Sequence, residues 1–384
     1  MKRYFEFVEA GSRKFWEVSL ELTRQTVRFG KLGTEGQIKK KEFDSPTKAR
    51  VSTLKLIAEK TGKGYVEIGG APQPHRDEKL EVAIEQSPDD PAAYLAYARW
   101  LEGKGDVRGE VIVKHVAKPN DRSLIQKHRE YLLGDLGSSE GPSVVWQFGV
   151  VKTAHVIGFT GAEAADDLEG VLELPSGRFV RELELGLMPA GDGATFQPCI
   201  DLLVKKKAPV TLRSLTIGGE GEEGKTGKIA PLAKSFPLLQ RLTLHGDKHE
   251  LGKNISWPEL RELTIGGEGL TKSVIKDLLA SRMSKLERLT LHPGLELTEK
   301  DLAPLLASDG LPALKHLGVI GCDFLDELVP MLGKSKLFSQ LTSLELTKGD
   351  VEADAFALGN FAHLKELKLD DKALAKKVKS RKLA

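Results

Sequence analysis

The chain has 384 residues, of which 40% are hydrophobic and 29% charged, and only two are cysteines. This composition supports a packed core and excludes a chain that is disordered over most of its length. Two cysteines exclude a disulfide framework and a cysteine-rich zinc site, and no apolar run approaches the ~18 residues of a membrane span. We therefore expect a cytoplasmic protein of two or three domains, with no secretion signal at its N-terminus.

The charge is distributed unevenly along the chain. The net charge is +2, but residues 1–70 hold 15 Lys and Arg against 9 Asp and Glu, whereas the remainder holds 42 against 46. If any part of the protein contacts phosphate groups, we expect it to be this basic N-terminal part. The alternative is that the excess charge only solvates a surface.

The first 70 residues have the pattern of strands followed by one helix. Residues 15–22 and 26–31 alternate in hydrophobicity, and residues 33–36 form a turn. Residues 37–43 alternate again, which predicts Lys39 and Lys41 on one side of that strand. Ser45 and Pro46 then predict the start of a helix that ends at Gly62, because Ser accepts hydrogen bonds from the first N–H groups and Pro fits the first turn.

These segments, in this order, resemble a WGR domain over nearly all of residues 1–70. The residues that carry the resemblance are Lys14–Glu17, Arg28–Lys31, Gly33–Gln37, Phe43 and Lys60–Tyr65. The resemblance implies a small β-sheet with one helix. In poly(ADP-ribose) polymerases such a domain acts at DNA ends, where the tryptophan of its Trp-Gly-Arg triplet stacks on the DNA and the arginine communicates with neighbouring domains.

In this chain the triplet is Phe29-Gly30-Lys31. Phe29 retains a ring that stacks on a base, whereas Lys31 lacks the planar, forked guanidinium of arginine. Arg28, Lys39 and Lys41 are expected phosphate contacts by position. The alternative is that Phe29 is a core aromatic residue and the lysines are solvated, so that this domain has lost DNA binding.

Residues 71–140 are predicted to be a helical connector. Ala71–Pro74 is a proline-interrupted linker, one amphipathic helix contains Leu80 and Ile84, and another spans residues 92–102. The segment Ala96–Glu110 resembles a bacterial motif that commonly precedes leucine-rich repeats and to which no catalytic role is attached. Within it, we expect Arg108 and Glu110 to cap or pair locally.

Residues 141–384 contain a repeated Leu-x-x-Leu-x-Leu pattern. Clear copies begin at Leu212, Leu239, Leu260, Leu286, Leu314, Leu341 and Leu364, and a weaker copy begins at Val180. Successive clear copies start 27, 21, 26, 28, 27 and 23 residues apart, a period typical of leucine-rich repeats. Helical patterns lie between copies, at residues 272–283, 299–307 and 324–332. One strand and one helix per unit predict a curved solenoid with a parallel sheet on its concave side and helices outside.

The residues between the repeated leucines are predicted to form the concave surface. They are polar and include a column of threonines, which suits recognition of a protein through hydrogen bonds and charge. The alternative is a polar surface that only contacts water. The residues expected to bind a partner are Arg241, Thr243, His245, Glu262, Thr264, Arg288, Thr290, His292 and His316.

Two motifs suggest a phosphate-binding or metal-binding site, but other features of the sequence argue against each of them. Gly219–Thr226 matches the phosphate-binding pattern G-x-x-x-x-G-K-T, but three glutamates in it repel phosphate, and Gly227 and Pro231 disfavour the helix that should follow. His245 and His249 have a helical metal-ligand spacing on what is predicted to be a strand and a turn. His245 and His292 lie two strands apart, a backbone spacing of about 10 Å, which predicts no shared metal.

The sequence therefore predicts an α/β protein with three parts: a WGR-like domain at residues 1–70, a connector at 71–140 and a leucine-rich-repeat solenoid at 141–384. No catalytic set has a recognisable signature, and no cofactor or metal is expected. We expect a non-enzymatic adaptor whose solenoid binds a protein and whose N-terminal domain engages DNA or a neighbouring domain. The alternatives are a protein-only scaffold and, more remotely, a nucleotide-dependent switch that uses Lys225 and Thr226.

Overall fold

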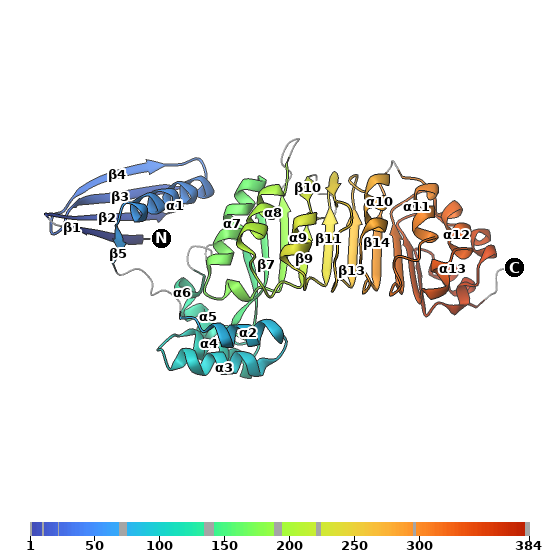
Figure 1. Ribbon diagram of the computed structural model, residues 1–384, viewed down its shortest axis with the longest axis horizontal. Helices are drawn as coiled ribbons and strands as arrows, with labels where there is room; N and C mark the ends of the chain where they lie inside the picture. Colours follow the sequence, from blue (N-terminus) through green and yellow to red (C-terminus); the bar gives the residue numbers. More distant parts are fainter. Residues whose placement is uncertain are drawn as a thin grey trace. The chain divides into compact units, whose positions relative to one another are not determined.

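A computed structural model describes residues 2–9, 11–21, 23–68, 75–133, 142–187, 194–219, 224–294 and 297–380 (Figure 1). The chain divides into two compact units, residues 1–141 with 147–149, and residues 142–146 with 150–384. The class is α/β, with a five-stranded sheet in the first unit and a ten-stranded sheet in the second. No helix of the described residues is both long enough and apolar enough to span a bilayer.

The N-terminal sheet is antiparallel and has the strand order β4-β3-β2-β1-β5. Helix α1 (Pro46–Gly62) packs on one face of it, and Ser45 accepts a hydrogen bond from the Lys48 N–H, so the predicted helix start is confirmed. The strands are β1 (Lys2–Glu9), β2 (Ser12–Glu21), β3 (Arg24–Lys31), β4 (Gln37–Glu42) and β5 (Val66–Glu67).

The core of this domain lies between α1 and the sheet. Phe5, Trp16, Val18 and Ile57 are buried there, and burial of each such side chain contributes about 1.5–3 kcal/mol. Strand β4 lies at the outer edge of the sheet, and all six of its side chains are exposed. The face of β4 on the α1 side is therefore a solvent surface.

Two glycines allow the loop between β3 and β4 to lie against Phe15, which is buried on the other face of the sheet. A Cβ atom on Gly36 would lie 2.5 Å from Cζ of Phe15, and one on Gly30 would lie 2.9 Å from the Gly36 Cα atom. Gly36 also has φ +75°, which disfavours a side chain. Gly30 of the Phe-Gly-Lys triplet and Gly36 of the turn are thus required by close packing.

The connector consists of short helices, and the first two of them are capped by aspartates. Asp77 accepts a hydrogen bond from the Leu80 N–H, and Asp90 accepts one from the Ala92 N–H. The linker predicted at residues 71–74 lies outside the described residues. The helices are α2 (Glu78–Gln86), α3 (Pro91–Glu102), α4 (Arg108–Ala117), α5 (Ser123–Lys127) and α6 (Arg129–Leu133).

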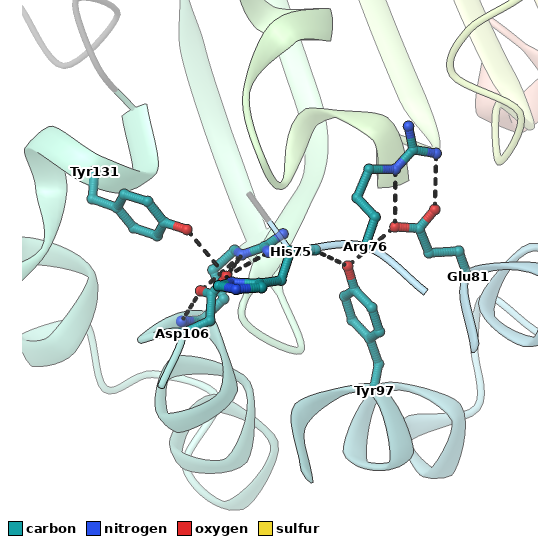
Figure 2. A network of polar contacts seen from close by, with 7 residues as sticks. His75, Arg76, Glu81, Tyr97, Asp106 and Tyr131 are labelled. Atoms are coloured by element: carbon teal, nitrogen blue, oxygen red, sulfur yellow. Dashed lines mark hydrogen bonds and ion pairs between the residues drawn. The ribbon is translucent and has the colours of Figure 1, made fainter. Parts of the chain in front are cut away.

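A buried ion pair between Asp106 and Arg108 lies at the start of α4 (Figure 2). Arg108 donates to the Asp106 carboxylate from Nε at 3.0 Å and from Nη2 at 2.6 Å, and its Nη2 also donates to the His75 carbonyl at 2.6 Å. The Tyr131 hydroxyl donates to Asp106 at 3.2 Å. Burial alone would raise the pKa of Asp106, but these bonds hold it below its ordinary value.

The same network continues through Tyr97 to the segment before α2 (Figure 2). The buried Tyr97 hydroxyl contacts the His75 carbonyl at 3.2 Å and the Glu81 carboxylate at 3.1 Å, and Arg76 donates to the other Glu81 oxygen at 3.1 Å. Gly109 completes the packing, because a Cβ atom there would lie 2.6 Å from the Ala98 carbonyl oxygen of α3. The network therefore ties residues 75–76 to α3 and α4, which is the local pairing expected for Arg108.

The second unit contains the ten-stranded sheet, in which neighbours along the chain are neighbours in space. The pairings between β7 and β17 are parallel. Its strands are β6 (Ser143–Gln147), β7 (Val150–Gly158), β8 (Glu182–Leu187), β9 (Ser214–Ile217), β11 (Arg241–His245), β13 (Glu262–Gly266), β14 (Arg288–His292), β15 (His316–Ile320), β16 (Ser343–Thr347) and β17 (Glu366–Leu369). A separate pair is formed by β10 (Lys225–Lys228) and β12 (Lys248–Glu250).

Helices lie along one face of this sheet (Figure 1). They are α7 (Gly161–Glu173), α8 (Gln197–Lys206), α9 (Ala230–Ser235), α10 (Lys272–Ala280), α11 (Glu299–Leu306), α12 (Leu325–Gly333) and α13 (Lys372–Lys379). Short 3-10 helices span Gly177–Phe179, Leu337–Gln340, Ala353–Leu358 and Phe361–His363. The helices predicted at residues 272–283, 299–307 and 324–332 correspond to α10, α11 and α12.

The core of this unit consists of the repeated leucine positions. From β8 to β17, each strand of the ten-stranded sheet begins two residues after the first position of its Leu-x-x-Leu-x-Leu copy, and its next two apolar positions are buried. The buried strand residues include Leu215, Ile217, Leu242, Leu244, Leu263, Ile265, Leu289, Leu291, Leu317 and Val319. Since side chains alternate along a strand, the residues between them face away from the core.

The contact between Gly36 and Phe15 makes a local prediction. Gly36→Ala should destabilise the N-terminal domain by about 1–3 kcal/mol more than Gly33→Ala, since overpacking costs that amount. Gly33 is the matched control because it has φ +85° but no atom within 4 Å of an added Cβ. Urea unfolding followed by the Trp16 indole NMR signal measures both, and equal midpoints would contradict the packing argument.

The ion pair in the connector makes a pH-dependent prediction. The pKa of Asp106 is lower in the folded protein than in the unfolded chain, where it is about 3.9. The ionised carboxylate therefore stabilises the fold fully above about pH 3.9, and this stabilisation is lost as the pH falls through the folded pKa. Asp106→Asn should cost about 3–5 kcal/mol at pH 7, because it removes the carboxylate with which the buried Arg108 forms its ion pair. Hydrogen exchange of the α3 and α4 amides measures this cost, which should shrink as the pH falls below the unfolded pKa of about 3.9 and through the lowered folded pKa. A cost independent of pH would contradict the prediction.

Candidate nucleic-acid and protein interfaces

The first candidate surface is the lysine strip, Lys31, Lys39 and Lys41. The register places Lys39 opposite Val27 and Lys41 opposite Gln25, so both lie on the face that carries Phe29. Lys31 follows Phe29 by two residues on β3 and therefore shares this face. The sequence prediction that Lys39 and Lys41 lie together is confirmed by this register.

The lysine strip is interleaved with aromatic rings. Nζ of Lys39 lies 5.5 Å from the centroid of the Phe29 ring, and Nζ of Lys41 lies 4.4 Å from that of Phe43. Such cation–π contacts contribute about 0.5–1 kcal/mol at exposed sites. None of the three lysines forms an ion pair with a carboxylate in the described parts of the chain, so the strip presents uncompensated positive charge.

Phe29 is half-buried and packs against the cluster that contains Phe5, Trp16 and Val18. One side of its ring therefore belongs to the core, and Lys39 lies over it. The arrangement fits the core-aromatic alternative, and it leaves only part of the ring for contact with a base.

Arg28 does not lie with the lysine strip, although the sequence grouped it with them. It lies on the opposite face of β3 because successive side chains alternate. Arg28 donates to the Glu17 carboxylate at 3.1 and 3.2 Å and to the Glu35 carbonyl at 3.3 Å. The hydrogen bonds that Arg28 donates to Glu17 lower the pKa of the Glu17 carboxyl and raise the pKa of the Arg28 guanidinium. Its charge is thus compensated within the domain.

The second candidate surface is the polar face of the ten-stranded sheet, formed by the residues between the buried leucines. Parallel pairing arranges these residues in three rows across β11, β13 and β14. The first row is Arg241, Glu262 and Arg288, continued by His316; the second is Thr243, Thr264 and Thr290; the third is His245, Gly266 and His292. All nine residues predicted to bind a partner therefore lie on this face.

Charges at one end of the first row are compensated internally. Arg241 donates to Glu182 at 3.2 Å and to the Ser214 hydroxyl at 3.3 Å. Glu182 also accepts a hydrogen bond from Thr153 at 2.7 Å and forms an ion pair with Lys152 at 3.0 Å. Burial raises the pKa of Glu182, but these partners together hold it below its ordinary value. By contrast, Glu262 and Arg288 are exposed and form no ion pair with any described residue.

His316 is buried and belongs to a hydrogen-bonded chain. Its Nδ1 lies 2.9 Å from the Ser343 hydroxyl, which donates to Glu366 at 3.1 Å. Because Ser343 donates to the carboxylate, it accepts from Nδ1–H, which leaves Nε2 unprotonated; that atom has no described partner. Burial and the nearby Arg288 lower the pKa of His316, so this residue is a neutral, largely internal part of the face.

His245 and His292 are much closer than the strand spacing predicted. Their ring centroids lie 5.2 Å apart with an interplanar angle of 78°. The backbone spacing of about 10 Å does not indicate this closeness, because the His245 ring lies over Gly266, which has no side chain to separate it from His292. His249 is not part of this pair: it is buried, and its ring nitrogens lie 2.9 Å from the Thr226 hydroxyl and 2.9 Å from the Gly266 carbonyl.

The segment that resembles a phosphate-binding loop leads into a strand. Lys225 and Thr226 belong to β10, whereas a phosphate-binding loop continues into a helix whose N–H groups bind the anion. The Thr226 hydroxyl is buried and contacts the Lys248 carbonyl and His249, so it does not face a ligand site. Residues 220–223 of the motif lie outside the described residues.

Comparisons with known proteins match the N-terminal part. A WGR domain model matches residues 1–72. The uncharacterized protein YfeS of Escherichia coli K12 is 39% identical over 67 residues, and the protein YehF of the same strain is 42% identical over 65 residues. Each match covers 17% of this chain, and the chain spans only 28% and 24% of these two relatives.

Two solved structures resemble larger parts of the chain with low scores. A Bacteroides fragilis protein covers 99% of this chain, and 94% of its own, at 23% identity and a TM-score of 0.49. Human 5T4, or trophoblast glycoprotein, covers 56% of this chain and 76% of its own at 17% identity and a TM-score of 0.32. The family assignment therefore rests on the N-terminal match, and residues 1–72 are a WGR domain.

Proposed function

We propose that this protein is a non-enzymatic adaptor whose WGR domain binds DNA through the lysine strip. The observation that carries the proposal is that Lys39 and Lys41 lie on the uncovered face of an edge strand without a described carboxylate partner. WGR domains commonly bind nucleic acids, and lysines of this kind bind phosphates by releasing condensed counterions.

The buried side of Phe29 favours contact with the DNA backbone over stacking on a DNA end. A ring stacks fully on a base only when its face is free, and this ring packs against the core on one side and Lys39 on the other. The departure of Phe29-Gly30-Lys31 from Trp-Gly-Arg has the same consequence, because lysine binds phosphate as a point charge. We therefore expect binding without strong preference for ends or sequence.

We further propose that the larger unit is a leucine-rich-repeat solenoid that binds a protein partner on its polar face. The support is the order of the parallel strands along the chain, the repeated burial of leucine positions and one helix between most strands. Glu262 and Arg288 expose opposite charges side by side near the middle of this face. Such charges select a partner of complementary pattern and accelerate its association.

DNA binding is tested with two lysine substitutions on the strip. Lys39→Glu and Lys41→Glu should each weaken binding of a short duplex and reduce the salt dependence of binding by about one counterion. Lys40→Glu is the matched control, because Lys40 lies between them on the opposite face of β4. Fluorescence anisotropy over a range of salt concentrations measures both quantities. An equal effect of all three variants would reject this surface, and no binding by wild type at low salt would support the protein-only scaffold.

Protein recognition is tested by charge reversal on the polar face. Arg288→Glu should reduce recovery of a specific partner from nuclease-treated lysate at least about tenfold, since loss of a paired charge at an interface costs 2–5 kcal/mol. Lys276→Glu, an exposed residue of α10, makes the same change of charge on the helical side. Quantitative mass spectrometry compares the two, and equal recovery would place the partner elsewhere.

A further inference from the structure

Helix α13 is held in place at the end of the ten-stranded sheet. Before each strand, a backbone carbonyl accepts hydrogen bonds from N–H groups of the next repeat, as the Thr342 carbonyl does from Lys365 and Glu366. The Lys365 carbonyl is the next in this series, and Nζ of Lys379 in α13 donates to it at 2.7 Å. The Asp371 carboxylate also accepts hydrogen bonds from N–H groups of the first turn of the helix. The helix is therefore a fixed element of the fold.

One face of α13 is buried, and the rest of its surface is basic. Leu374, Ala375 and Val378 are buried where the helix packs against β17 and the 3-10 helices before it. A basic amphipathic helix binds a membrane by inserting its apolar face, and here the protein's own core covers that face. The helix contains no acidic residue, and its exposed lysines are Lys372, Lys376, Lys377 and Lys379.

The lysines of α13 form a local concentration of uncompensated positive charge. Lys372, Lys376 and Lys379 are spaced i, i+4 and i+7, so they lie in one stripe about 10 Å long. None of the four lysines forms an ion pair with a carboxylate of any residue that the structure describes. Residues 71–384 as a whole hold 42 Lys and Arg against 46 Asp and Glu, so the positive charge belongs to this helix and not to the unit around it.

The chemistry of this surface favours a polyanion over a protein partner. Lysine is depleted in protein–protein interfaces, whose main contributions to affinity come from buried aromatic and Arg side chains. Helix α13 exposes no aromatic or large apolar side chain, whereas ammonium groups bind phosphates as point charges. We propose that α13 is a second nucleic-acid-binding surface, which contacts the phosphate backbone through Lys372, Lys376 and Lys377. This inference does not rest on the lysine strip, because α13 belongs to the other unit of the chain.

A triple substitution in the full-length chain tests this surface. Lys372→Gln, Lys376→Gln and Lys377→Gln together should weaken binding of a short DNA duplex at least about tenfold at low salt and reduce its salt dependence by about two to three counterions. Glutamine has nearly the helix propensity of lysine. Lys379 stays unchanged because it donates to the Lys365 carbonyl. Fluorescence anisotropy measures affinity over a range of salt concentrations, and circular dichroism verifies folding.

The matched control removes the same charge from lysines that are not clustered. Lys205→Gln, Lys234→Gln and Lys276→Gln change one exposed lysine on each of α8, α9 and α10. This triple variant should bind the duplex with nearly the affinity and salt dependence of wild type. If the two triple variants weaken binding equally, only the net charge matters and the proposal is overturned.

Lysine acetylation distinguishes this surface from the lysine strip. A saturating amount of the duplex should protect Lys372 and Lys376 from acetic anhydride, measured by mass spectrometry, while Lys276 remains reactive. The same protection should persist in Lys39→Glu/Lys41→Glu protein. Equal acetylation of the α13 lysines with and without the duplex, or wild-type affinity in the α13 triple variant, overturns the proposal. In either case, weaker binding by Lys39→Glu/Lys41→Glu protein would still support the WGR surface.

Discussion

Alternation of side chains along extended strands is the constraint on which both candidate surfaces depend. In the larger sheet, burial of two apolar positions per strand forces the intervening residues to the other face, and parallel pairing then lines them up across neighbouring strands. In the WGR domain the same alternation places Lys39 and Lys41 with Phe29 and separates them from Arg28. Strand register therefore determines which charges act together.

Much of this register could be read from the sequence, because the repeated leucines identify the buried positions directly. The positions of α10, α11 and α12 followed from the same reasoning. Strand β1 was not predicted, because it has aromatic residues on both faces and so shows no clear alternation of apolar and polar residues. Tyr4 stacks on Phe15 on one face, and Phe5 contacts Trp16 on the other. Strand β5 has only two residues, and its pairing with β1 joins distant parts of the chain, which local patterns do not reveal.

The candidate sites were predicted less completely than the fold, because side-chain direction depends on neighbours. The pairing of Arg28 with Glu17 connects two strands whose register is not evident from either alone. The rings of His245 and His292 lie close together because Gly266 between them has no side chain, and the spacing of the backbone strands alone does not predict that contact. Gly36 and Gly109 show the same principle elsewhere, since each absent side chain permits a contact that defines the local packing.

Strand β4 has one further consequence, which follows from its position at the edge of its sheet. An edge strand presents unpaired N–H and C=O groups, to which a strand of another molecule readily adds. Lys39, Lys40 and Lys41 stand consecutively along this strand and are all exposed. Two copies brought edge to edge would juxtapose six ammonium groups, and their repulsion opposes aggregation through this edge. The positive charge that attracts a polyanion would thus also keep the domain from polymerising with itself.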